Sequence, residues 1–144
     1  MAERPLTPGD LKGSAEKVHM AKVQEQFDRV RKEQEEQRAI HVAFMSRDVH
    51  PQVMDRLNAA IKRAAEQGLH EVQVLTFPAS FCNDQGRRIN NAEPDWADSL
   101  EGYAKKAHEF FVAELKPMGF KSRAQVLNYP DGRLGDVGLF LSWS

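Results

Sequence analysis

The strongest indication of the fold is Val137-Gly-Leu-Phe-Leu-Ser-Trp143, near the end of a chain of 144 residues. Every second residue from Val137 to Trp143 is apolar, so these side chains fall on one face of a β-strand. Phe140 falls on the opposite face. A strand with apolar residues on both faces is typical of the middle of a sheet. The stretch therefore predicts a central strand.

The residues around this stretch predict a small sheet with helices. His70–Phe77 and Phe120–Val126 alternate as strands do, and Pro94–Leu115 has the apolar spacing of a helix between them. Pro130–Asp136 forms a turn before the last strand. Because a helix joins the first two strands, we expect them to run parallel, with the third strand between them. The pattern predicts an α+β fold in the element order α-α-β-α-β-β, with a mixed three-stranded sheet of strand order 1-3-2 covered by helices.

The N-terminal part is expected to stand apart from this domain. We interpret residues 1–13 as a disordered leader, residues 14–45 as a helical arm, and residues 46–144 as the α+β domain. A second helix is expected from Pro51, with Gly68 as its left-handed C-terminal residue. Ile40–Met45 also alternates as a strand would, although we expect a helix there.

The arm carries an apolar row at spacings of three, four and three residues, which is the pattern of one side of a helix. The row consists of Met20, Val23, Phe27 and Val30. The heptad that follows, Lys32–Arg38, is entirely polar. The arm is therefore expected either to pack on the domain only near Ile40 and Phe44 or to associate with a second copy as a short coiled coil.

Composition narrows the classes of function. The net charge of −1 gives no general attraction to nucleic acid or to an anionic membrane. The single cysteine, Cys82, excludes a disulfide within the chain. No apolar run resembles a signal peptide or reaches the length needed to cross a bilayer. We expect a soluble cytoplasmic protein that binds neither membrane nor nucleic acid.

Two turn-rich segments share an Asp/Gly/Arg phrase. Pro78–Glu93 contains Asp84-Gln-Gly-Arg87, and Pro130–Asp136 contains Asp131-Gly-Arg133. Parallel strands would bring both segments to the same end of the sheet. Arginine guanidinium groups match carboxylates and phosphates. The candidate ligand-binding residues are Arg87, Arg88, Arg133, Asp84, Asp131 and Asn90. The alternative is that both phrases are ordinary turns whose arginines pair with nearby carboxylates.

No catalytic signature is present. The histidines stand in no nucleophile or His-Glu-x-x-His pattern, no phosphate loop occurs, and neither a metal nor a cofactor is expected. The sequence favours a small non-enzymatic interaction or regulatory protein. It would contact a protein partner or a second copy through the row Met20, Val23, Phe27 and Val30, and through the loop edge of the domain. The alternative is a domain that binds an anionic ligand, or an enzyme that uses the Arg/Asp cluster near Cys82.

Overall fold

The structure is a computed structural model that describes residues 7–144. The chain divides into an N-terminal unit that ends at Val42 and a C-terminal unit, Ala43–Ser144. Helix α1, Pro8–Ser46, forms the described part of the first unit, and its last turn belongs to the second. No helix among the described residues is both long and apolar enough to cross a membrane.

Helix α1 begins earlier than the sequence pattern predicts. The expected disordered leader spans residues 1–13, of which residues 1–6 lie outside the described part and residues 8–13 are helical. The reason is a reciprocal cap before Ser14. Thr7 Oγ1 accepts a hydrogen bond from the Asp10 amide, and Asp10 Oδ2 accepts one from the Thr7 amide, both at 3.1 Å. Pro8 suits the first helical position.

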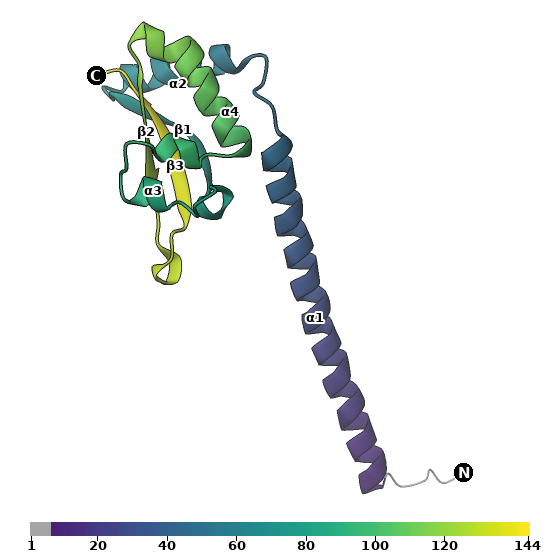
Figure 1. Cartoon of the computed structure of the whole chain (residues 1–144). Coiled ribbons are helices and arrows are strands. Elements are labelled where there is room, and N and C mark those ends of the chain that lie inside the picture. Colours follow the sequence, from purple (N-terminus) through teal and green to yellow (C-terminus); the bar gives the residue numbers. More distant parts are fainter. Residues whose placement is uncertain (1–6) are drawn as a thin grey trace. The chain divides into compact units, whose positions relative to one another are not determined.

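The sheet has the predicted order β1-β3-β2 (Figure 1). Its strands are β1, Glu71–Pro78, β2, Lys121–Val126, and β3, Asp136–Ser142. Strands β1 and β2 are both antiparallel to β3, so they point the same way, as expected. Because β3 separates them, every hydrogen-bonded pair is antiparallel. The sheet is therefore antiparallel rather than mixed.

Helix α2, Val53–Glu66, ends as the sequence predicts. Gly68 has a φ of 78°, and the amides of Gly68 and Leu69 donate to the Ala65 and Ala64 carbonyls, each at 3.0 Å. This is the hydrogen-bond pattern of a Schellman motif. Residues 40–45 lie within α1, so they form a helix and not a fourth strand.

The third predicted helix is shorter and less regular than expected. Trp96–Ser99 forms a separate 3-10 turn, and α4, Gly102–Phe110, begins only after an extended Leu100 and Glu101. Gly102 has a φ of 58°, and a Cβ atom there would lie 2.7 Å from the Cα atom of Met45. A π-helical turn, Phe111–Leu115, continues α4. Gly102 is therefore the first residue of α4, at a point of close packing, and does not lie inside a helix.

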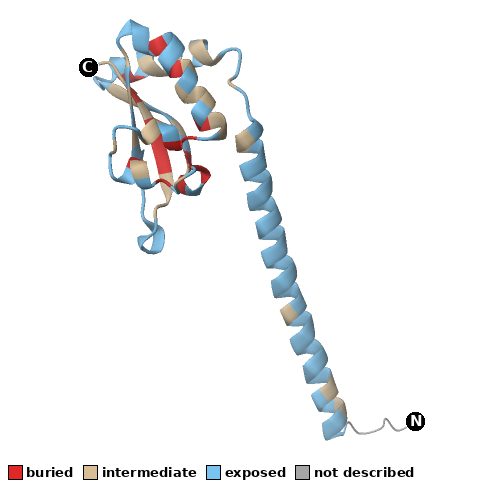
Figure 2. Cartoon of the chain, viewed as in Figure 1, coloured by how far each residue is buried: buried red, intermediate tan, exposed pale blue. Residues whose placement is uncertain are grey.

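Two clusters of buried side chains cover one face of the sheet. The first contains Val137, Leu139 and Phe77, and the second contains Leu141 and Phe111. Figure 2 shows the buried residues concentrated along β3 and the elements that pack on it. The first cluster also includes Ala79, Phe81, Cys82 and Ile89. The long segment after β1 is thus part of the core and holds a short helix, α3, Arg87–Asn90.

The last turn of α1 packs on the first cluster, within the C-terminal unit. The ring of Phe44 lies 5.5 Å from that of Phe77 and 4.9 Å from that of Phe81. Ile40, in contrast, is 54% exposed. The sequence pattern predicts that the arm packs on the domain near Ile40 and Phe44. Within the C-terminal unit, Phe44 packs on the core.

The opposite face of the sheet is covered by polar side chains. Arg123 on β2 reaches across β3 to Glu71 on β1, with its Nε atom 2.9 Å and its Nη2 atom 2.5 Å from the two carboxylate oxygens. Its guanidinium carbon lies 4.1 Å from the centre of the Phe140 ring. The outward row Lys121, Arg123 and Gln125 is exposed, as its alternation predicts. On this face, the ion pair between Arg123 and Glu71 therefore lies over the aromatic ring of Phe140.

Candidate functional site

The two segments with the Asp/Gly/Arg phrase adjoin at one end of the domain. The Ala79 amide donates to the Gly135 carbonyl at 2.8 Å, and Tyr129 Oη donates to Asn90 Oδ1 at 2.9 Å. A Cβ atom on Gly86 would lie 3.5 Å from Leu134 Cδ1. The topology thus brings together two segments that are separated in the sequence by residues 94–129.

Several of the predicted ligand-binding residues are already engaged within these segments. Asp84 accepts hydrogen bonds from the amides of Gly86 and Arg88, each at 3.0 Å. Arg88 Nε lies 3.5 Å from Asp95 Oδ2 and 4.0 Å from carboxylate oxygens of both Asp84 and Glu93. Its charge is offset by three carboxylates. Arg88 and Asp84 therefore have a structural role that an anionic ligand would have to disturb.

Arg87 and Arg133 are placed differently. Both are exposed, and neither forms an ion pair within residues 7–144. Asp131, also exposed, has a φ of 53°, an unusual value for a residue with a side chain. Binding of an anion by these two arginines would require no change in the core.

Cys82 is poorly suited to act as a nucleophile. Its side chain is buried, and burial is the main reason that its pKa rises to about 11. The carboxylates of Asp84 and Glu101 also raise this pKa, while a hydrogen bond with Ser99 lowers it. The thiol is therefore protonated near neutral pH, and the thiolate is the reactive form.

The apolar row of α1 forms one exposed side of a helix. Met20 and Phe27 are each 64% exposed and Val30 is 50% exposed, while Val23 is partly covered. No residue of α1 is buried. The helix thus exposes large apolar side chains that are not buried by packing within its own unit.

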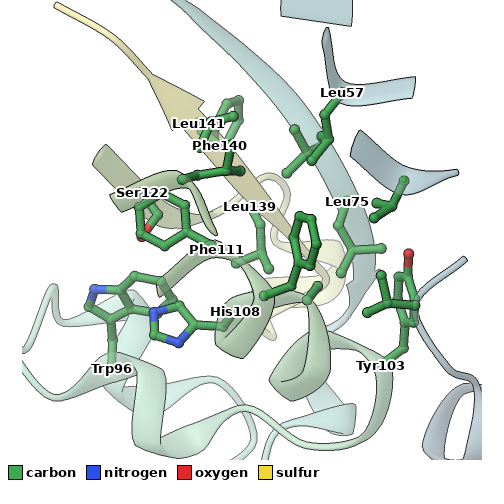
Figure 3. A pocket seen from close by; sticks show the side chains of 16 residues that line it. Leu57, Leu75, Trp96, Tyr103, His108, Phe111, Ser122, Leu139, Phe140 and Leu141 are labelled. Atoms are coloured by element: carbon green, nitrogen blue, oxygen red, sulfur yellow. The ribbon is translucent and has the colours of Figure 1, made fainter. Parts of the chain in front are cut away.

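A cavity under α4 is a feature that sequence reasoning missed. It has a volume of about 80 Å³ and is lined by side chains of α2, α4 and all three strands (Figure 3). At one wall the ring of His108 lies 5.4 Å from that of Trp96 and 6.1 Å from that of Phe111. In the sequence, His108 belongs to no nucleophile or metal-binding pattern. Its position at a cavity depends on packing between distant elements, which has no local signature.

Burial lowers the pKa of His108 from its ordinary value of 6.5, and the charge of Lys116 lowers it further. The carboxylates of Glu109 and Asp98 raise the pKa of His108, but the net shift is downward. The imidazole is therefore neutral near pH 7 and offers one hydrogen-bond donor and one acceptor.

No group of three or more His, Cys, Asp or Glu side chains in the described part of the chain is arranged to hold a metal ion. No protein-family model, curated protein or solved structure matches this chain.

Proposed function

We propose that this chain is a non-enzymatic interaction or regulatory protein whose α1 helix binds another helix through the apolar row Met20, Val23, Phe27 and Val30. The observation that carries the proposal is the exposure of this row on a helix that buries none of its residues. An isolated helix with exposed apolar residues is stabilised when a second helix covers them. The simplest partner is a second copy of the chain.

The composition of α1 supports a protein partner over other surfaces. Acidic and basic residues alternate along its polar sides, and the heptad Lys32–Arg38 contains both signs. A helix that binds an anionic membrane usually carries an excess of Lys and Arg on its polar face. The mixed charges of α1 are instead typical of the flanks of helix–helix contacts.

Sedimentation at several concentrations tests the proposal. Phe27→Asp places a charge in the middle of the apolar row, and we expect it to shift the protein from an associated form toward the monomer. Val18→Asp is a matched control, because Val18 is 55% exposed and lies nine residues earlier, on the opposite side of the helix. It introduces the same charge and should leave association unchanged.

Two results would count against the proposal. Equal effects of the two substitutions would show that charge, and not the apolar row, governs association. A wild-type chain that remains monomeric at the highest accessible concentration would exclude the second copy as the partner.

The alternative function, binding of an anionic ligand, is supported by the exposed Arg87 and Arg133 on adjoining segments. Replacing both with Gln should change the free energy of unfolding by no more than about 1 kcal/mol, because exposed charges contribute little to stability. Calorimetric titration with inorganic phosphate should then show weaker binding in the double variant. Equal binding by the wild-type and double-variant proteins, or no binding by either, would remove this alternative.

A further inference from the structure

The cavity under α4 is bordered by both buried clusters and is partly open to solvent. Leu139 contributes from the first cluster, and Leu141 and Phe111 contribute from the second. Leu57 of α2 and Leu75 of β1 complete the apolar wall, and Figure 3 shows their side chains around the same space. The cavity therefore interrupts the core over the central strand.

Two irregularities of the backbone lie beside this cavity. The β1–β3 register shifts between Gln73 and Leu75, which leaves Val74 as an extra residue in β1. Helix α4 passes into the π-helical turn that contains Phe111 and Leu115. Side chains from both irregular segments line the cavity. Bulges in strands and π-helical turns both recur at functional sites, where they redirect side chains.

The lining determines which chemical group the cavity accepts. It contains no Asp, Glu, Lys or Arg side chain. An unpaired charge buried there would lose its hydration without compensation. Tyr103, His108 and Ser122 are the side chains at the wall that can both donate and accept hydrogen bonds, and within residues 7–144 none of the three has a hydrogen-bond partner. An apolar group with one uncharged polar atom fits this wall.

The volume limits the size of that group. An apolar cavity of about 150 Å³ admits benzene, so a cavity of about 80 Å³ holds on the order of three carbon atoms. His108 also lines a second hollow, of about 590 Å³. The charged side chains of that hollow are Asp98, Glu101 and Glu109 against a single Lys105. Lys116 also acts on His108, so charges of both signs lie near its imidazole.

We propose that this cavity binds the end of a short aliphatic chain, carried by a molecule whose polar group is uncharged. The aliphatic end occupies the space over Leu139 and Leu141. The polar group lies toward His108 and Ser122. This site is independent of the apolar row on α1. The result of testing the cavity therefore has no bearing on the proposed helix contact.

Titration of the full-length, ¹⁵N-labelled protein with three probes of equal chain length tests the site. The probes are 1-propanol, propylamine and propionate, compared at pH 7 and at matched ionic strength. We expect saturable changes in the amide signals of Val53, Ala107 and Leu139 with 1-propanol. Propylamine is a cation at pH 7 and should bind several-fold more weakly, because no carboxylate lines the cavity to pair with it. Propionate should also bind several-fold more weakly, because no Lys or Arg side chain lines the cavity to pair with its carboxylate. Binding in the millimolar range is expected for molecules of so few atoms.

Substitutions separate this site from weak binding elsewhere. Ala107→Leu fills the cavity and should abolish the saturable response. Ala59→Leu is the matched control, because Ala59 is exposed on α2 and does not line the cavity. If Ala107→Leu fails to fold, Val74→Phe can block the cavity from β1, where Val74 is 40% exposed and has room for a larger side chain.

Three outcomes would overturn the proposal. Signal changes that increase linearly without saturation would indicate a solvent effect. A response that persists in both cavity-blocking variants would place binding elsewhere. Propionate binding as tightly as 1-propanol would contradict the proposed polar environment.

Discussion

Gly102 shows how a single residue sets the limits of an element. Its φ of 58° and the closeness of Met45 leave no room for a side chain, so α4 begins there and not at Pro94. The sequence shows a glycine within an apolar helical pattern. It does not show that Met45, more than fifty residues earlier, would pack against that glycine. Local spacing therefore predicted the helix but misplaced its start.

His108 gives the molecule a defined dependence on pH. Its pKa is lowered in the folded state, so the unfolded chain takes up the proton first as the pH falls. The free energy of unfolding should be insensitive to His108 above its ordinary pKa of 6.5. It should then decrease as the pH falls from 6.5 to the lowered value of the folded protein.

Urea unfolding at a series of pH values checks this expectation. His108→Gln should show a shallower decrease below pH 6.5 than the wild-type protein. Carboxylates such as Glu71, whose pKa is lowered from 4.5 by Arg123, contribute only at more acidic pH. Identical slopes for the two proteins between pH 6.5 and 5 would mean that His108 is not the titrating group.

At the scale of elements, strands were predicted better than helix boundaries. Alternation identified β3 as the central strand because Val137, Leu139 and Leu141 all face the core. The start of α1 was missed because its cap is formed by Thr7 and Asp10, outside the apolar pattern. Helix α3 was also missed, since four residues are too few to show a period.

The central position of β3 leads to a prediction for Leu141. Its side chain is only 3% exposed, so Leu141→Ala should reduce the free energy of unfolding by about 2–5 kcal/mol. Leu127, 39% exposed, provides a comparison, and Leu127→Ala should cost clearly less. Chemical denaturation of both variants gives the difference. A cost below about 1 kcal/mol for Leu141→Ala would contradict its place in the core.

At the scale of the whole molecule, the chain separates into a core that carries stability and a helix that presents an apolar row. Topology alone predicted that the segments after β1 and β2 meet at one end of the sheet. It could not predict that Arg88 is held by Asp84, Glu93 and Asp95, because the paths of the loops decide those contacts. The cavity under α4 could not be predicted from the sequence either, because side chains of distant elements line it.

Removal of residues 1–38, followed by thermal unfolding and sedimentation of the same sample, tests whether the fold and the interaction reside in separate parts of the chain. This variant keeps Phe44 and Met45, which pack on the core. At a concentration where the full-length chain is monomeric, we expect the midpoint of unfolding to remain nearly unchanged, because residues 8–38 include no buried side chain. At higher concentration, the variant should lack the association that we expect of the full-length chain. Loss of cooperative unfolding, or association that persists without the apolar row, would contradict the separation of fold and interaction.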